Sequence, residues 1–158
     1  MQSKVLLLNG PNLNMLGTRE PELYGRDTLA DIEKAARSHG KSLGLAVDCH
    51  QSNHEGELVT WIQKSRTTHA GLILNPAGFG TTSVAILDAL YICEIPIIEI
   101  HLTNIYKREA FRHPTYVSSV AKGTITGFGA HGYILALDAM ARLIANAAAA
   151  KASAKKSK

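Results

Sequence analysis

Two pairs of residues have the types and spacing of acid–base chemistry. Arg19 and Tyr24 share the long connection "NGPNLNMLGTREPELYG", residues 9 to 25, which follows a short apolar run. A tyrosine acts as a base near neutral pH only if its phenolate is stabilised, and a neighbouring guanidinium favours that charged form. Glu99 and His101 are two residues apart, so on a β-strand they would point to the same face. A carboxylate beside an imidazole fixes its tautomer, which suits a general acid.

The elements that must position these residues are short strands alternating with helices. Strand-like apolar segments are KVLLLN (4–9), GLAVDC (44–49), AGLILN (70–75), IPIIEIH (95–101) and GTITGF (123–128). One helix is expected from the capping residue Thr28, with Asp31 three residues later, to Gly40. Further helices are expected over 55–66, 82–93 and 132–150. This alternation predicts an α/β fold: a flavodoxin-like, five-stranded parallel sheet with helices on both faces.

Polar residues gather where four of these strands end: at 9–12, 51–54, 75–76 and 99–104. In an open parallel sheet, ligands bind outside the carboxyl ends of the strands. The 9–25 connection is also longer than the usual 2–6 residues between a strand and a helix, which is typical of lids and binding loops. A binding site is therefore expected at this edge of the sheet.

Length and charge bound the classes of function. The 158 residues suit a single domain over 1–150, followed by a basic, flexible tail over 151–158. All 13 acidic residues and 13 of the 17 basic residues precede residue 150, so the net charge of +4 comes from the tail lysines. A neutral body argues against a nucleic-acid partner.

Cysteine content and hydrophobic runs indicate a cytoplasmic protein. Cys49 and Cys93 lie in apolar contexts, which predicts two reduced thiols and no disulfide, and no metal-binding spacing occurs. The N-terminal apolar run is too short for a signal peptide, and no stretch approaches the ~20 apolar residues of a membrane span.

Several chemistries common on such a fold are excluded by the residues present. The loop after the first strand contains Pro11 and large apolar residues where a flavin phosphate would need a small, hydroxyl-rich cradle. Asn9 and Asn75 stand where a phospho-acceptor domain needs carboxylates. No Walker or dinucleotide fingerprint, nucleophile elbow or strand-end lysine for a Schiff base occurs.

Five segments resemble one family, the type II 3-dehydroquinate dehydratases. They are LLLNGPNLNMLGTREPELYG, QSNHEGELV, NPAGFGTTSVAILDAL, EIHLTNIYKREAFRH and GTITGFGAHGY, in order over roughly residues 4 to 145. The resemblance implies a flavodoxin-like subunit that assembles through trimers into a dodecamer. It also implies dehydration of 3-dehydroquinate to 3-dehydroshikimate by anti elimination through an enolate, without metal or cofactor. The same reaction serves the shikimate pathway and quinate breakdown.

The resemblance assigns catalytic roles to five residues. Tyr24 would take the proton next to the ketone, with Arg19 favouring its phenolate. Asn12 would hold a water that donates to the enolate oxygen. His101 would protonate the departing hydroxyl, oriented by Glu99.

Substrate binding is assigned to a second group. The backbone amides of Leu102 and Thr103, with the Thr103 hydroxyl, would hold the substrate carboxylate. Asn75 and Arg112 would bind ring hydroxyls, and Asp88 would reach the site of a neighbouring subunit.

The remaining histidines are expected outside the chemistry. His54 is expected to cap a helix or support an interface, and His113 to lie next to the residues that touch substrate. Surface or capping positions are expected for the others: His39, His50, His69 and His131.

The chain departs from the family pattern at three positions. Thr81 stands where the family usually has a histidine that contacts substrate hydroxyls, Gly80 where a threonine or serine is common, and Thr103 where serine is frequent. Two functions therefore stay open: an active dehydratase, or a catalytically weakened member that serves as a binding or assembly component.

Overall fold

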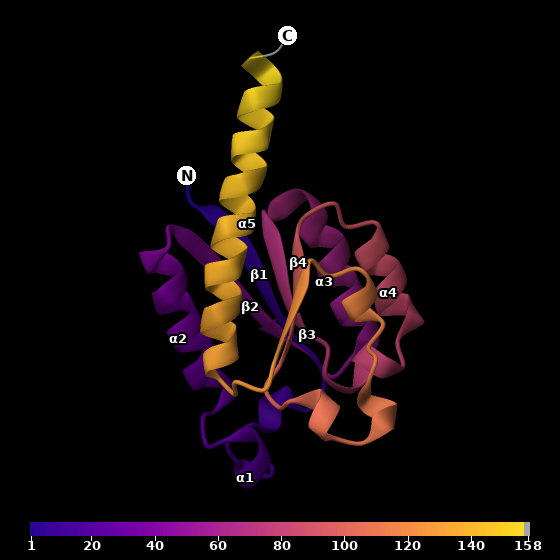
Figure 1. The fold of residues 1–158 in the computed structure, drawn as a ribbon. Helices are drawn as coiled ribbons and strands as arrows, with labels where there is room; N and C mark the ends of the chain where they lie inside the picture. The colour runs from indigo at the N-terminus through magenta and orange to yellow at the C-terminus, as the bar shows by residue number, and fades with distance from the viewer. Residues whose placement is uncertain (157–158) are drawn as a thin grey trace.

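Five parallel strands form one sheet in the order β2-β1-β3-β4-β5 (Figure 1). In the computed structural model, which describes residues 1–156, the strands are β1 Ser3–Asn9, β2 Leu45–Gln51, β3 Gly71–Asn75, β4 Ile97–His101 and β5 Gly123–Thr126. This is the flavodoxin-like strand order, so the predicted α/β class and five-stranded parallel sheet are confirmed. Predicted and observed strand ends differ by at most two residues.

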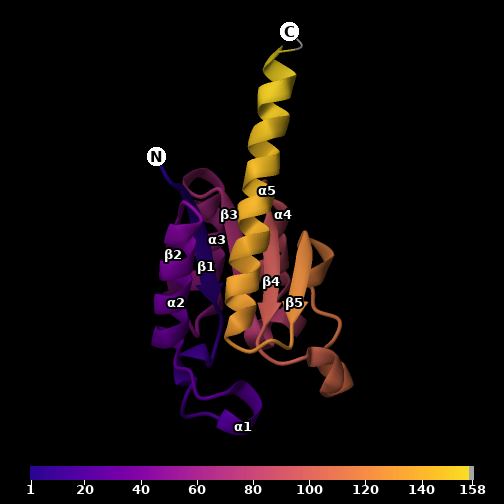
Figure 2. The same ribbon diagram turned by 60° about the vertical axis from the view of Figure 1, so that its left-hand side comes forward.

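Helices cover both faces of the sheet, as Figures 1 and 2 show. They are α2 Leu29–Ser42, α3 Glu55–Thr68, α4 Val84–Tyr91 and α5 His131–Lys156, whereas the short helix α1 Pro21–Tyr24 lies beyond the edge of the sheet. Alternate residues of a strand point to opposite faces, so β1 supplies two cores. Val5 and Leu7 pack in the core that includes α2 and α5, whereas Leu6 and Leu8 pack in the core that includes α3 and α4.

The start of α2 agrees with its sequence pattern, and its end does not. Thr28 and Asp31 form the predicted capping box, each side chain bonding the other's backbone N–H. The helix passes through Gly40 and continues to Ser42. A Cβ at Gly40 would lie 2.3 Å from the Val47 side chain, so this glycine lets α2 approach β2. Gly44, with φ of 74°, follows the helix in the left-handed conformation that favours glycine.

Helix α5 is longer than predicted and extends past the sheet (Figure 1). Its 151–156 segment, expected as the start of a flexible tail, continues the helix, and residues 157–158 lie outside the described residues. Among the described helices, α5 has the length and hydropathy to cross a membrane over His131–Lys155. Its first half contributes four apolar side chains to the core: Tyr133, Ala136, Leu137 and Met140.

Both cysteines are free. Cys93 is buried, and burial raises the pKa of the half-buried Cys49 thiol to about 12, which keeps that thiol protonated at neutral pH.

The loops at the carboxyl edge of the sheet carry four short 3-10 helices: Leu13–Met15, Ala77–Thr81, Ile105–Lys107 and Ala110–Arg112. A fifth, Val117–Ser119, lies farther along the connection from β4 to β5, with Val117 in the core that includes α3 and α4. The loops after β1 and β3 meet closely, because a Cβ at Gly10 would lie 2.5 Å from the Pro76 carbonyl oxygen. A side chain at residue 10 would separate these two loops, so glycine is required there.

Candidate active site

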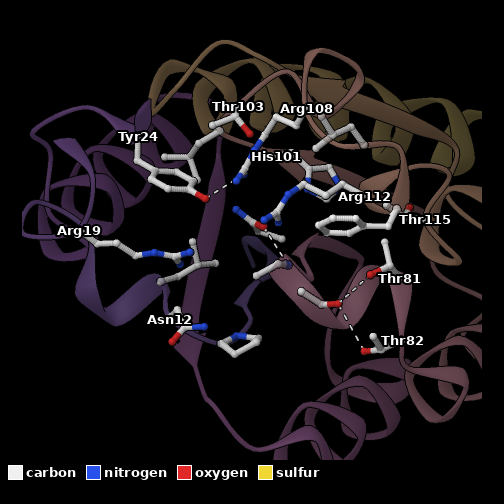
Figure 3. Close-up of a pocket in the computed structure, with 18 residues that line it drawn as sticks. Asn12, Arg19, Tyr24, Thr81, Thr82, His101, Thr103, Arg108, Arg112 and Thr115 are labelled. Carbon is white, nitrogen blue, oxygen red and sulfur yellow. Dashed lines mark hydrogen bonds between the residues drawn. The ribbon is translucent and has the colours of Figure 1, made fainter. Parts of the chain in front are cut away.

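A cavity of about 360 Å³ opens at the carboxyl edge of the sheet (Figure 3). It is lined by residues from the 9–25 connection and from the loops after β3 and β4. Nine of the residues singled out in the sequence line it: Asn12, Arg19, Tyr24, Asn75, Thr81, His101, Leu102, Thr103 and Arg112. The structure thus brings together residues that are up to 100 positions apart in the chain.

Two arginines surround Tyr24. Arg108 Nη1 donates a hydrogen bond of 2.9 Å to the Tyr24 hydroxyl oxygen, and the Arg108 guanidinium carbon lies 5.6 Å from the ring centroid. The guanidinium of Arg19 lies over the same ring, at 5.1 Å from its centroid. Figure 3 shows Arg19 and Arg108 approaching Tyr24 from different sides. Two guanidinium groups thus contact one phenol, one through a hydrogen bond and both through the ring.

The 9–25 connection is held by strained backbone and by a contact to the next loop. Asn12 and Glu20 both have positive φ, at 68° and 38°. The backbone N–H of Asn12 donates to Asn53 Oδ1 at 2.9 Å, which ties this loop to the loop after β2. Glu20 precedes α1, the short helix that presents Tyr24. Left-handed conformations of non-glycine residues are costly and gather at functional loops.

His101 is the last residue of β4 and is paired with Glu99 as predicted from their spacing. His101 Nε2 lies 2.7 Å from Glu99 Oε1, and both side chains are buried. Because a carboxylate is an acceptor, Nε2 must carry the proton in this bond. That leaves Nδ1 as the nitrogen that gains and loses a proton, and His101 lines the cavity.

Glu99 is fully buried yet ionised. Thr115 Oγ1 donates to its Oε1, while Ser118 Oγ and Thr124 Oγ1 donate to its Oε2. Burial raises the pKa of Glu99, but hydrogen bonds from His101, Ser118 and Thr115 outweigh burial and hold the pKa below its ordinary value. The carboxylate is therefore negative at neutral pH.

The turn after β4 offers amide donors. The carbonyls of Leu102 and Thr103 accept hydrogen bonds from Gly129 N and Thr126 Oγ1, at 2.9 and 2.8 Å. Within residues 1–156 the amide N–H groups of Leu102 and Thr103 have no acceptor, and both residues line the cavity. These two amides are free to bind an anion.

The side chain of Asn75 is held in place by the buried Tyr133. Asn75 Nδ2 donates to the Tyr133 hydroxyl at 2.9 Å, and that hydroxyl donates to Asn9 Oδ1 at 2.7 Å. Asn75 Oδ1 accepts from the Ala77 amide. The second N–H of the Asn75 amide remains for a ligand, since no described residue accepts from it.

Arg112 and Thr81 lie on another wall of the cavity (Figure 3). Arg112 Nε donates to Glu109 Oε2 at 2.7 Å, and its guanidinium lies 5.2 Å from the Phe111 ring centroid. Thr81 is half-buried, and its hydroxyl donates to the Gly78 carbonyl at 3.2 Å.

Two of the predicted residues do not line the cavity. Glu99 lies behind His101, as its proposed role requires. Asp88 is exposed on α4 and is not among the cavity residues of its own chain.

The other histidines lie away from the cavity lining. His54 occupies the N-cap of α3, but its side chain makes no capping hydrogen bond. His39 joins α2 to α5 through Asp138 at 2.7 Å, while His50 and His69 both bond Asp48. His113, which follows Arg112, has a buried Nε2 without a partner among the described residues.

Sequence reasoning missed Arg108 and the hydroxyls that bind Glu99. Arg108 lies within the segment EIHLTNIYKREAFRH, seven residues after the end of β4, where its contact with Tyr24 has no local signal. Thr115, Ser118 and Thr124 are ordinary loop and strand residues in the sequence. Their shared partner becomes visible only once β4, β5 and the 117–119 helix are placed together.

The cavity is cationic and holds no cluster typical of a metal site. Arg19, Arg108 and Arg112 line it, and no Asp or Glu does. Among residues 1–156, no group of three or more His, Cys, Asp or Glu side chains could hold a metal ion. The arrangement can bind a small anion between a phenol and an imidazole.

Comparisons with known proteins agree with the resemblance in the sequence. The family model of class II dehydroquinases matches residues 3–141. The 3-dehydroquinate dehydratase 2 of Pseudomonas putida is 51% identical over 149 residues, covering 94% of this chain and 100% of that protein. A 3-dehydroquinate dehydratase of Streptomyces coelicolor is 52% identical over 153 residues, 94% of each chain. The type II dehydroquinase structure from Propionibacterium acnes has a TM-score of 0.87 at 41% identity, covering 90% of this chain and 98% of that one. The chain belongs to the class II dehydroquinase family.

Proposed function

We propose that the protein dehydrates 3-dehydroquinate to 3-dehydroshikimate. The observation that carries this proposal is the placement of Tyr24, held by Arg108, and of the His101–Glu99 pair around one cationic cavity. The names of its relatives supply the substrate. In this proposal Tyr24 is the base, His101 is the acid, and the turn after β4 provides donors for the substrate carboxylate.

Binding of the substrate carboxylate fits the turn after β4. This part of the cavity lining contains the free backbone amides of Leu102 and Thr103, together with the Thr103 hydroxyl. The three cavity arginines favour an anion there, because only two carboxylates, of Glu20 and Glu109, pair with them and neither lines the cavity. Asn75 and Arg112 would then bind the ring hydroxyls.

The proposed reaction needs only acid–base groups. The Tyr24 phenolate removes the proton next to the ketone, and the electron pair of that C–H bond forms an enolate. Asn12 holds a water that donates to the enolate oxygen. The enolate then collapses, the C–O bond breaks, and His101 gives the Nδ1 proton to the departing hydroxyl, which leaves as water. No electron acceptor is required, so we propose that no cofactor or metal takes part.

The 9–25 connection is proposed to act as a lid. It carries both Arg19 and Tyr24, and the side chain of Tyr24 is half-buried in the cavity. Closing this loop would exclude water from the enolate and strengthen the contacts of Tyr24 with Arg19 and Arg108.

The active form is proposed to be a cytoplasmic homo-oligomer, a dodecamer built from trimers. Support comes from an exposed stripe on α4, formed by Val84, Asp88, Tyr91 and Ile92. Three of these four residues are apolar, and Asp88 is the charge that a cationic cavity of another copy would attract.

A second function rests on Thr81. The resemblance expects a histidine at this position, and the threonine provides no imidazole. The Thr81 hydroxyl donates instead to the Gly78 carbonyl within its own loop. A chain weakened in this way would serve as a binding or assembly component.

The rise of enone absorbance on adding 3-dehydroquinate to purified protein separates the two functions. We expect slow but genuine turnover, reduced by roughly 10²–10⁴-fold in Tyr24→Phe, the range of a positioned acid–base group. Tyr106→Phe is the matched control, because Tyr106 is exposed and does not line the cavity. Absence of turnover in the parent would support the binding component, and a Tyr24→Phe variant with more than about a tenth of the parent rate would contradict the assignment of the base.

A further inference from the structure

Glu99 has an unusual set of partners for a buried carboxylate. Oε1 faces His101 Nε2 and the Thr115 hydroxyl, and Oε2 faces the hydroxyls of Ser118 and Thr124. A carboxylate offers about four lone-pair positions, and four donors fill them here. Three of these donors are neutral hydroxyls, which we call the hydroxyl cage: Thr115, Ser118 and Thr124.

The cage is assembled from separate elements. Thr124 lies directly opposite Glu99 in the β4–β5 ladder, and its hydroxyl is 3.2 Å from Oε2. Ser118 belongs to the 117–119 helix and donates at 2.5 Å. Its amide donates to Thr115 Oγ1 at 3.2 Å, and the two hydroxyl oxygens are 2.7 Å apart. Both hydroxyls donate to the carboxylate, and either one could be the donor in the contact between them.

We propose that the hydroxyl cage positions Glu99 as a saturated anion, and that it thereby fixes the Nε2–H tautomer of His101 and sets how tightly His101 holds its Nδ1 proton. This inference rests on the proposed dehydratase function for its kinetic consequence. Thr115, Ser118 and Thr124 are positioning residues, since they act through Glu99 and His101. A carboxylate whose acceptor positions are all occupied by donors has no free position for a proton, so the acidic proton stays on the imidazole.

Other charged groups near the pair are the same in all variants considered below. Arg19, Tyr24, Arg108 and Arg112 line the cavity that His101 faces. From α5, Tyr133 bonds Asn9 and Asn75, and β3 contributes no charged residue. A change in titration on removing a cage hydroxyl would therefore report the hydroxyl itself.

The sign of the effect follows from which form the cage stabilises. Dehydration requires protonated His101, so activity falls as pH rises through the titration of the Glu99–His101 pair. Glu99 is an anion in both states, and the cage hydroxyls compete with the imidazolium for its charge, so they weaken the hold of the carboxylate on the His101 proton. Removing one hydroxyl leaves more of that charge to stabilise the protonated imidazole, so the pair titrates at higher pH. The alkaline limb of the pH–rate profile should move upward, while the acid becomes weaker.

Ser118→Ala and Thr124→Val test the cage, because neither residue lines the cavity, with Ser119→Ala as the matched control. Ser119 is the next residue of the same short helix, and its hydroxyl donates to the Tyr116 carbonyl. For Ser118→Ala we expect the midpoint of the alkaline limb to move about one pH unit higher, the shift for a lost hydrogen bond to a charged group. We expect kcat to fall by at most about tenfold, because an acid weaker by one pKa unit slows proton transfer by no more than that, and KM to stay within about twofold, because Glu99 does not line the cavity. Ser119→Ala should behave as the parent.

A lower kcat with an unmoved limb would overturn the proposal, because a purely structural role predicts that result. Nitrogen-15 NMR of the histidines provides a readout without turnover. The neutral parent should show His101 protonated at Nε2, and Ser118→Ala should titrate at higher pH. A neutral Nδ1–H tautomer in the parent, or equal titrations, would overturn the cage even in an inactive protein. Failure of turnover alone would count against the proposed function and leave the NMR result to decide the cage.

Discussion

Thr81 is the residue at which the resemblance to the family predicts a histidine that contacts substrate. Its side chain ends at a hydroxyl that bonds the Gly78 carbonyl within the same loop. A histidine at this position would extend several bonds farther from the backbone, into the cavity that Thr81 lines. Losing one hydrogen bond to substrate costs about 0.5–1.5 kcal/mol, or roughly 2- to 12-fold in rate.

Thr81→His should therefore raise kcat/KM by about 2- to 10-fold, the reverse of losing one hydrogen bond. Steady-state kinetics with Thr82→His as the control would check this, since Thr82 lines the same cavity and its hydroxyl also lies near the Gly78 carbonyl. If Thr81→His is no faster than the parent, threonine is an equivalent solution at this site. Adding Gly80→Thr should bring no further gain, because a Cβ at Gly80 would lie 3.0 Å from the Pro76 ring and 3.4 Å from Thr115.

At the residue scale, the sequence indicated groups that carry their chemistry in their type. Tyr24, His101 and Glu99 could be proposed from residue type, spacing and family motif. The positions of Arg108 and of the hydroxyl cage could not, because a threonine or serine hydroxyl has no distinctive pattern. Its partner is set by strand register, as for Thr124 opposite Glu99.

At the element scale, α2 matters because it begins where the loop of Tyr24 ends. Its capping box joins Thr28 and Asp31, with the Thr28 hydroxyl 2.7 Å from Asp31 Oδ2 and 3.2 Å from the Asp31 amide. The Thr28 methyl also lies against Gly17, so the two ends of the 17–28 segment meet there. This element could be predicted at its start, where the cap has a sequence signature. Its end could not, because Gly40 is required by packing against β2 and not by a turn.

Thr28→Ala should lower the free energy of unfolding by about 1 kcal/mol, and Thr28→Ser should lower it by much less, because serine retains the capping hydroxyl. Urea unfolding at fixed protein concentration would measure both, since an oligomer's apparent stability depends on concentration. Equal losses in the two variants would assign the effect to the methyl contact with Gly17 and contradict the capping argument.

At the scale of the whole molecule, the two faces of α4 have opposite character. Ile86, Ala89 and Leu90 are buried against the sheet. The exposed stripe of Val84, Asp88, Tyr91 and Ile92 repeats at helical spacing. Strand and helix patterns in the sequence predicted the fold of one chain, but they could not show which helix faces a second copy, because exposed apolar residues occur on many surfaces.

The proposed assembly predicts that active sites are shared between subunits. If Asp88 of one copy reaches the cavity of the next, Asp88→Asn should keep the trimer-based particle in sedimentation and lower kcat/KM, since the amide lacks the charge that pairs with the cavity arginines. Mixing unfolded Asp88→Asn and Tyr24→Phe chains and refolding them together provides the decisive measurement. Some sites would then combine Tyr24 from an Asp88→Asn subunit with Asp88 from a Tyr24→Phe neighbour, about a quarter of all sites for an equal, random mixture in a symmetric ring. Activity of the mixture per amount of protein should exceed the average of the two variants measured separately. A mixture that only averages its components, or a monomer that is fully active on its own, would place Asp88 outside the chemistry of every site.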